Sequence, residues 1–199
     1  MTHPTRSAQL LQSGILLASV FWAAHSVAIE PPQARPPLFN EKEFVSYKQK
    51  GRGSLTGQTF LASPTGKAVT QAGVPVHLIP ATRSTRAWFE HTVRVPACPA
   101  TDSVPTKQDT DACAAEAVRE LLADKKLQPF VRTTRANPTG HFWFTKIPAG
   151  QYYVLSLING GSNSHQDERL SGVAWLFIDL EAGEKATNLV VTDCKSGFC

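Results

Sequence analysis

Four histidines, His77, His91, His141 and His165, are the side chains in this chain best suited to metal binding or proton transfer. An imidazole can do either near neutral pH. Their spacing supports neither role, because no two stand two residues apart on one strand or four apart on one helix. We therefore expect satisfied or exposed histidines, no metal and no cofactor.

The serines offer no recognisable nucleophile. Ser54, Ser156 and Ser171 lack the glycine-flanked setting of a nucleophile elbow, and no order of Ser, His and Asp stands out from chance. We therefore expect a chain that is not an enzyme. A hydrolase with an unrecognised site is kept as the third alternative.

The four cysteines, Cys98, Cys113, Cys194 and Cys199, favour disulfide bonds in an exported chain. Four cysteines allow three pairings. We favour Cys98 with Cys113 and Cys194 with Cys199, because each pair closes a short loop at little entropic cost. A zinc site is the competing interpretation, but the chain has no C-x-x-C pair to support tetrahedral coordination.

Three aromatic residues are the candidate ligand-facing side chains: Trp88, Trp143 and Tyr153. Alternation along their strands places them opposite the expected core. If they converge, they form a flat platform that could stack on sugar rings or on a partner's apolar surface. The competing interpretation is that an amphipathic helix covers this face of the sheet.

Length and charge set broad limits on the class of protein. The 199 residues favour one domain with a substantial core. The formal net charge is +4, without a cluster of Lys and Arg. We therefore expect neither nucleic acid nor an acidic membrane surface as a partner.

The first 28 residues have the pattern of a signal peptide. Arg6 supplies the positive charge, residues 10–24 are mostly apolar, and Ser26 and Ala28 suit cleavage after Ala28 or after Ser26. An uncleaved anchor is the alternative, although the apolar run is short for a bilayer span. We expect a periplasmic or secreted protein with no membrane span after cleavage. The proline-rich residues 29–51 then form a spacer.

The region from 133 to 157 organises the expected sheet. Gly140 suits a tight turn, and the strand that follows places Phe142 and Phe144 on the core face with Trp143 opposite. Pro148 interrupts the ladder because it lacks an N–H. Residues 151–157 are apolar on both faces, which predicts a central strand.

Shorter patterns complete the fold. Further strands are expected at 54–61, 74–80, 86–95, 130–135, 172–180 and 186–192. Residues 111–125 have helical spacing and predict one amphipathic helix, capped by Thr110 or Asp111. About seven turn-separated strands around a single core predict an all-β protein with a β-sandwich fold.

Several short motifs carry a resemblance to a known family. They are Gly53-x-Leu55-x-Gly57, Gly73-Val74-Pro75-Val76-x-Leu78, Gly140-x-Phe142-x-Phe144 and Ile147-Pro148-Ala149-Gly150-x-Tyr152. Together they resemble the carboxypeptidase regulatory-like domain, which implies a transthyretin-like (prealbumin-like), Ig-like β-sandwich. The resemblance covers residues 52–192, interrupted at about 81–130. We therefore expect a domain at 52–199 with a helical insert at about 96–128.

Members of that family are mostly non-catalytic accessory modules. The resemblance therefore implies an exported module that binds an envelope or extracellular protein or another envelope component, with glycan binding by an aromatic face as the alternative. Hydroxyisourate hydrolases share the transthyretin-like shape but need histidines, an arginine and a C-terminal Tyr-Arg-Gly-Ser. This chain ends in Lys195-Ser196-Gly197-Phe198-Cys199, so that activity is not carried over.

Overall fold

The structure is a computed structural model that describes residues 39–63, 66–94, 106–159 and 171–193. The chain divides into two units, Met1–Ala34 and Arg35–Cys199, and every described residue belongs to the second. The predicted signal peptide and residues 29–38 of the proline-rich stretch lie outside the described residues.

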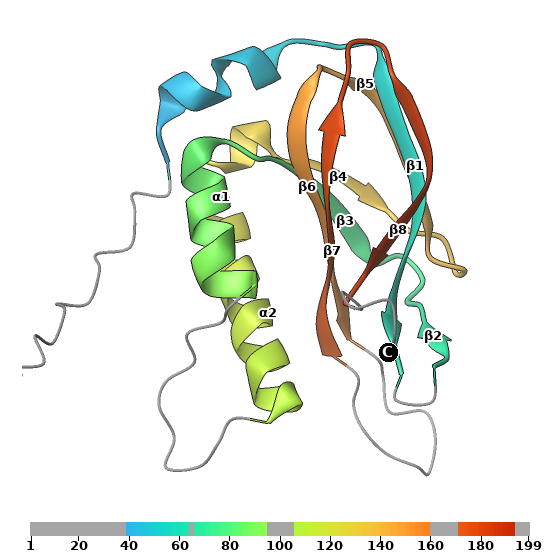
Figure 1. Cartoon of the computed structure of the whole chain (residues 1–199). Coiled ribbons are helices and arrows are strands. Elements are labelled where there is room, and N and C mark those ends of the chain that lie inside the picture. Colours follow the sequence, from blue (N-terminus) through green and yellow to red (C-terminus); the bar gives the residue numbers. More distant parts are fainter. Residues whose placement is uncertain (1–38, 64–65, 95–105, 160–170, 194–199) are drawn as a thin grey trace, which may run out of the picture. The chain divides into compact units, whose positions relative to one another are not determined.

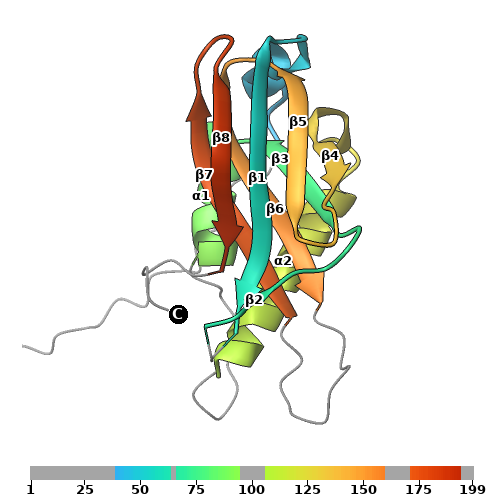
Figure 2. The same cartoon turned by 90° about the vertical axis from the view of Figure 1, so that its right-hand side faces the viewer.

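The described residues form a curled, mixed sheet of eight strands (Figures 1 and 2). The strands are β1 (Gly53–Ala62), β2 (Ala68–Val69), β3 (Pro75–Pro80), β4 (Arg132–Arg135), β5 (His141–Ile147), β6 (Gly150–Asn159), β7 (Ser171–Leu180) and β8 (Lys185–Thr192). Their order is β2-β1-β8-β7-β6-β3-β4, and β5 also pairs with β1. The pairing of β1 with β8 is parallel, whereas the other pairings are antiparallel.

An apolar cluster fills the inside of the curl. Phe142 and Phe144 of β5 are buried there with Tyr152 and Val154 of β6, as strand alternation predicted. β6 lies between β3 and β7, which confirms its predicted central position. Gly140 has a φ of +82° in the turn before β5, a conformation that glycine adopts without steric cost.

Helical segments cover the outer side of β6 and β7 (Figure 1). They are η1 (Glu41–Lys48), α1 (Arg83–Phe89), η2 (Glu90–Arg94), α2 (Lys107–Ala123) and η3 (Gln128–Phe130). A second apolar cluster lies between these helices and the sheet, with Val118 and Leu121 of α2 packing near Leu155 of β6. The predicted helix is confirmed, although Thr106 rather than Thr110 or Asp111 caps it, in a reciprocal pair with Asp109.

The strand predicted at 86–95 is wrong. Its described residues, 86–94, are helical and form most of α1 and all of η2, so the described residues hold two α-helices rather than one. Thr82 caps α1 by accepting a hydrogen bond from the Thr85 N–H. The neighbours Trp88 and Phe89 are both buried in the helix-side cluster, which a half-buried strand cannot achieve.

Residues 39–49 are packed onto the domain and are more than a spacer. Phe44 is fully buried, and its ring centroid lies 4.9 Å from that of Phe130. Glu43 accepts hydrogen bonds from the backbone N–H of Ser84 at 3.0 Å and from its hydroxyl at 2.9 Å. These bonds, the backbone one first, lower the Glu43 pKa, so the carboxylate is held ionised beside the start of α1.

Candidate functional site

The structure separates the three candidate aromatic residues. Trp88 is 7% exposed and Tyr153 4% exposed, because both lie in the helix-side cluster. Trp143 is 58% exposed on β5. The three side chains therefore do not form one platform, since Trp88 belongs to α1 itself and the helices cover the face of β6 on which Tyr153 lies.

A row of aromatic side chains runs from the buried helix-side cluster to the surface at β7. The ring of Phe89 stacks on Tyr153 at 4.0 Å and meets Trp175 edge-on at 4.7 Å. Burial raises the pKa of Tyr153 to about 12. Phe177 lies 5.5 Å from Tyr153 and is exposed at the end of this row.

Trp143 lies on the outer face of β5, β1 and β8, the side turned away from the cluster inside the curl. Trp143 pairs with Thr56 of β1, and the next row on the same face joins His141, Gln58 and Val190. We call these five residues the Trp143 surface. It presents one large exposed aromatic ring and one exposed valine among hydroxyl, amide and imidazole groups.

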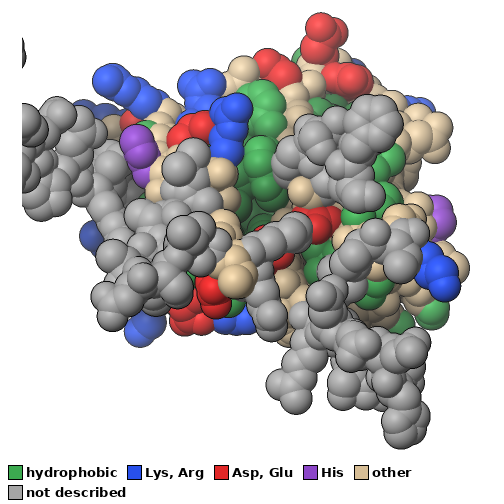
Figure 3. Space-filling model, turned by 60° about the horizontal axis from the view of Figure 1, so that its bottom comes forward, with side chains coloured by type: hydrophobic (Ala, Val, Ile, Leu, Met, Phe, Trp, Pro, Cys, Tyr) green, Lys and Arg blue, Asp and Glu red, His purple; other side chains and the backbone are tan. Residues whose placement is uncertain are grey.

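A cavity of about 500 Å³ lies on the helix side, at the end of the sheet where α2 begins. The described residues that line it are Val93, Arg94, Thr110, Asp111, Ala114, Val173, Trp175 and Asp193. We call it the α2–β7 cavity. Figure 3 brings this end forward and shows hydrophobic side chains beside acidic ones.

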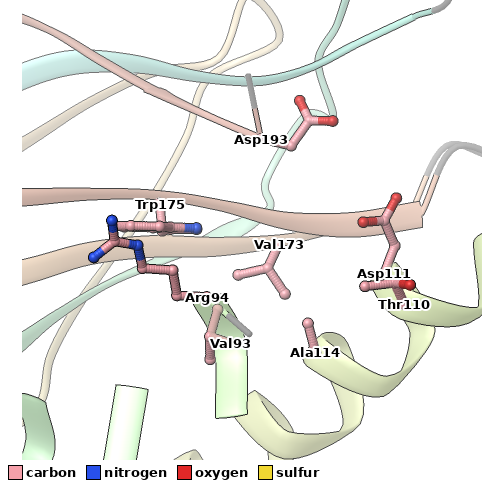
Figure 4. Close-up of a pocket in the computed structure, with 8 residues that line it drawn as sticks. All are labelled: Val93, Arg94, Thr110, Asp111, Ala114, Val173, Trp175 and Asp193. Carbon is pink, nitrogen blue, oxygen red and sulfur yellow. The ribbon is translucent and has the colours of Figure 1, made fainter. Parts of the chain in front are cut away.

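The cavity lining is divided by charge. Arg94 and Trp175 lie at one end in Figure 4, Asp111 and Asp193 lie toward the other, and Val173 and Ala114 lie between them. Arg94 donates one hydrogen bond of 2.9 Å to Glu90. A carboxylate oxygen of Asp193 accepts from the backbone N–H of Ala62 at 2.8 Å, which fixes the position of this carboxylate.

Sequence reasoning missed the cavity because its lining comes from η2, α2, β7 and the residue after β8. No spacing in the sequence joins four such distant segments. The one visible signal was the alternation of Val173, Trp175 and Phe177, which predicted a shared face of β7. That pattern did not show whether the face would line a cavity.

The described histidines lie on separate elements. His77 of β3 and His141 of β5 each contact a threonine hydroxyl through Nδ1, at 3.0 Å from Thr133 and 2.9 Å from Thr139. His91 is exposed on η2, and His165 lies outside the described residues. Within residues 39–63, 66–94, 106–159 and 171–193, no group of three His, Cys, Asp or Glu side chains could hold a metal ion.

The candidate serines also lie apart. Ser54 belongs to β1 and Ser171 to β7, whereas Ser156 of β6 donates a hydrogen bond of 2.8 Å to the Pro75 carbonyl. That bond links β6 to β3 through the Ser156 side chain.

Across the described ranges, no helix is both long and apolar enough to span a bilayer.

Cys113 lies on α2 and is disulfide-bonded. Cys98, Cys194 and Cys199 lie outside the described residues. The pairing of Cys98 with Cys113, and of Cys194 with Cys199, therefore stays a prediction.

Comparison with known proteins gives a structural likeness but no family. No protein-family model and no curated protein sequence matches the chain. The crystal structure of a candidate carbohydrate-binding protein from Pseudomonas aeruginosa is similar, with a TM-score of 0.58 and 22% identity over 78% of this chain and 98% of that one. This similarity shows that the two chains share a fold.

Two pilus proteins are more distant. The minor pilin of Streptococcus agalactiae gives a TM-score of 0.33 at 11% identity over 74% of this chain and 47% of the pilin. The pilus backbone protein of Streptococcus pneumoniae gives 0.27 at 14% identity over 70% of this chain and 41% of that one. One of these three proteins is described as a candidate carbohydrate-binding protein and the other two as pilus proteins.

Proposed function

We propose that this chain is an exported, non-catalytic β-sandwich module of the carboxypeptidase regulatory-like type, and that it binds a glycan of the cell envelope or its surroundings through the Trp143 surface. The observation that carries the proposal is the exposure of Trp143 among polar neighbours on an open sheet face. An exposed indole ring with polar groups around it combines an apolar contact face with nearby hydrogen-bonding partners.

The chemistry of the Trp143 surface suits a sugar. The C–H face of a pyranose ring can stack on the apolar face of an indole, while the ring hydroxyls need hydrogen-bond partners at its edge. Thr56 and Gln58 stand on the neighbouring strand, about 4.8 Å from β5, as strand spacing requires. The Gln58 Nε2 donates to the Thr139 carbonyl at 2.7 Å, which holds this side chain in place. The Thr56 hydroxyl and the Gln58 amide oxygen would bond the sugar edge while Trp143 contacts its face.

The neighbour from Pseudomonas aeruginosa supports this choice among binding functions. It is a candidate carbohydrate-binding protein, and the structural similarity to this chain covers 98% of its length. Fold likeness alone does not transfer a function. The proposal therefore depends on the exposed aromatic ring, and the neighbour adds to it.

Export is part of the proposal. The signal-peptide pattern in residues 1–28 and the even number of cysteines both suit a periplasmic or secreted protein. Such a location would bring the Trp143 surface to envelope or extracellular glycans, which a cytoplasmic protein would not meet.

A glycan array with the folded protein tests the proposal. We expect one glycan class to bind, binding to fall at least tenfold in Trp143→Ala, as a lost stacking contact of about 1.4 kcal/mol implies, and to be largely kept in Trp143→Phe. Val45→Ala is the matched control, because Val45 is similarly exposed on η1, away from β5. Binding that survives Trp143→Ala would remove the Trp143 surface from the proposal.

A protein partner is the second candidate, and the exposed apolar pair Phe177 and Val190 favours it. Trp175 pairs with Thr192 across β7 and β8, and Phe177 and Val190 each lie two residues from that pair on the same face. Capture of an envelope protein that is lost in Phe177→Ser and unaffected by Trp143→Ala would support this function instead of glycan binding.

A further inference from the structure

We propose that the Trp143 surface selects an anionic glycan, one whose sugars carry carboxylate or sulfate groups. This inference rests on the proposed glycan binding and names the class of glycan. Its basis is a group of cations that the fold gathers at one end of the Trp143 surface. The sequence itself has no cluster of Lys and Arg, so this grouping is a property of the folded chain.

Positive side chains from four segments meet where β1 and β8 begin and β5 ends (Figure 2). The backbone N–H of Gly51 donates to the Lys146 carbonyl at 3.2 Å, and Ser54 of β1 pairs with Lys185 of β8. Arg132 reaches the same place from β4, through its 2.8 Å hydrogen bond to the Lys146 carbonyl. We call the five cations gathered here the basic rim: Lys50, Arg52, Arg132, Lys146 and Lys185.

The basic rim has no ion-pair partner in the described part of the chain. The ion pairs found there all lie on helical segments and join Lys48 with Glu41, Arg94 with Glu90, and Arg119 with Glu116. The turn before β8 adds two carboxylates, Glu181 and Glu184, and Glu184 accepts a 2.7 Å hydrogen bond from the Glu181 N–H. A ligand at this end of the sheet would therefore meet more cations than carboxylates.

The basic rim adjoins the Trp143 surface on the outer face of the sheet. Thr145, Ser54 and Lys185 form one row across β5, β1 and β8. Trp143 and Thr56 form the next row on the same face, two residues along each strand. A strand spacing of about 4.8 Å and a rise of about 3.4 Å per residue place the Cα atoms of Trp143 and Lys185 about 12 Å apart.

This spacing suits a chain of sugars. An oligosaccharide that stacks one ring on Trp143 and runs toward Lys185 brings the substituents of its next unit to the basic rim. A carboxylate or sulfate on that unit would accept charge-assisted hydrogen bonds, which are stronger than those of a neutral hydroxyl. The lysine ammonium is a point charge on a flexible stem, so it can pair with either anion.

An anionic lipid surface is the competing partner for the basic rim. A face that enters the headgroup region of a bilayer needs a broad apolar area. Trp143 instead has polar neighbours on the adjacent strand, Ser54, Thr56 and Gln58. A single aromatic ring among hydroxyl and amide groups suits a sugar better than a lipid.

Paired glycans test this inference on the folded protein. The probes are galacturonic acid oligomers beside their methyl esters, and sulfated galactose oligomers beside their unsulfated parents. We expect one anionic form to bind at least tenfold more tightly than its neutral counterpart at low ionic strength. The ratio should fall as salt is raised toward 1 M, where the Debye length is about 3 Å, because exposed charges are then screened. The pair that shows the preference identifies the anionic group.

Lysine variants assign the preference to the basic rim. The double variant Lys146→Gln with Lys185→Gln should lower the preference for the anionic form below threefold and leave binding of the neutral form unchanged. Lys185→Arg should keep the preference, because it keeps the charge. Lys126→Gln is the matched control, since Lys126 is an exposed lysine that follows α2 on the helix side. Thermal melting of each variant checks that the fold is retained.

The outcomes separate this inference from the proposed function. Equal binding of anionic and neutral glycans that is lost in Trp143→Ala would overturn the inference alone. Glycan binding that survives Trp143→Ala would overturn both. Binding to phosphatidylglycerol vesicles that requires Lys146 and Lys185, without a preference among glycans, would assign the basic rim to a membrane surface instead.

Discussion

The guanidinium of Arg132 on β4 donates a 2.8 Å hydrogen bond to the backbone carbonyl of Lys146 near the end of β5. It also reaches the carbonyls of Thr145 at 3.5 Å and Gln49 at 3.4 Å. In the described residues β4 pairs only with β3, and β5 only with β1, so these are edge strands. A side chain thus joins two edges that backbone pairing leaves open.

Replacing Arg132 should loosen this connection between β4 and β5. We expect Arg132→Ala to lower the free energy of unfolding by about 1 to 3 kcal/mol, the usual range for hydrogen bonds from a charged group. Arg119→Ala removes only an exposed ion pair with Glu116 and should change stability by less than about 0.5 kcal/mol. Urea denaturation of both variants measures the difference, and equal effects would contradict the assigned role of Arg132.

The hydroxyl of Thr59 is a polar atom inside the curl. Thr59 is fully buried, and among the described residues its Oγ1 has no hydrogen-bond partner. Thr59→Val keeps the shape and removes the uncompensated group, so we expect a gain of about 1 kcal/mol in stability. A higher midpoint in thermal or urea unfolding would agree with this, whereas a loss would point to a partner for the hydroxyl.

Gly57 is a position where β1 needs a residue without a side chain. A Cβ at Gly57 would lie 2.5 Å from the Leu189 carbonyl oxygen and 2.8 Å from the Leu189 Cβ. Gly57→Ala should therefore cost roughly 1 to 3 kcal/mol, as overpacking in a core does. Gly172→Ala is the matched control, since its nearest neighbour would be at an ordinary 3.5 Å. Equal unfolding midpoints for the two variants would refute the steric argument.

His77 should make stability depend on pH. Burial lowers its pKa to about 4, below the ordinary value of 6.5. The unfolded chain therefore binds a proton first as pH falls below 6.5, so stability decreases from there to about pH 4 and His77 adds no further loss below it. At about 1.4 kcal/mol per pKa unit, and allowing for partial solvent contact, the loss is on the order of 2 kcal/mol.

Urea unfolding at pH 7 and pH 4.5 measures this effect. His77→Gln should lose less stability than the wild-type chain over that interval, because glutamine does not titrate. His141→Gln is the control, since His141 is exposed on β5. Identical pH dependence in the wild type and His77→Gln would show that other groups cause the loss.

The predicted bond between Cys98 and Cys113 should stabilise the helical insert. Cys113→Ser and Cys98→Ser should each lower stability by roughly 2 to 5 kcal/mol, the range for loss of a native disulfide. Peptide mapping by mass spectrometry without reduction identifies the pairs. A bond from Cys113 to Cys194 or Cys199 would instead tie α2 to the C-terminal residues.

Strand alternation predicted much of the sheet because one face of each strand is apolar. Phe142 and Phe144 are buried and Trp143 is exposed, as expected from a period of two. The strand prediction for residues 86–95 was wrong because Phe89, Val93 and Val95 also alternate with polar residues. The cap at Thr82 and the adjacent pair Trp88 and Phe89 were the better signal of a helix.

The candidate site was less predictable than the sheet. The exposure of Trp143 followed from its own strand, whereas the burial of Tyr153 depended on a helix packing over it from elsewhere in the chain. The α2–β7 cavity depends on four segments meeting in space. A single sequence does not show which distant segments of the chain meet in the folded protein.

The parallel pairing of β8 with β1 has a consequence for biogenesis. β8 fills the gap between β1 and β7, and Ala62 is joined to Asp193 across 131 positions. A nascent chain that has been synthesised only as far as β7 therefore lacks an interior strand and leaves neighbouring backbone groups unpaired. Such long-range pairing favours slow folding, and the sheet can close only after β8 has been synthesised.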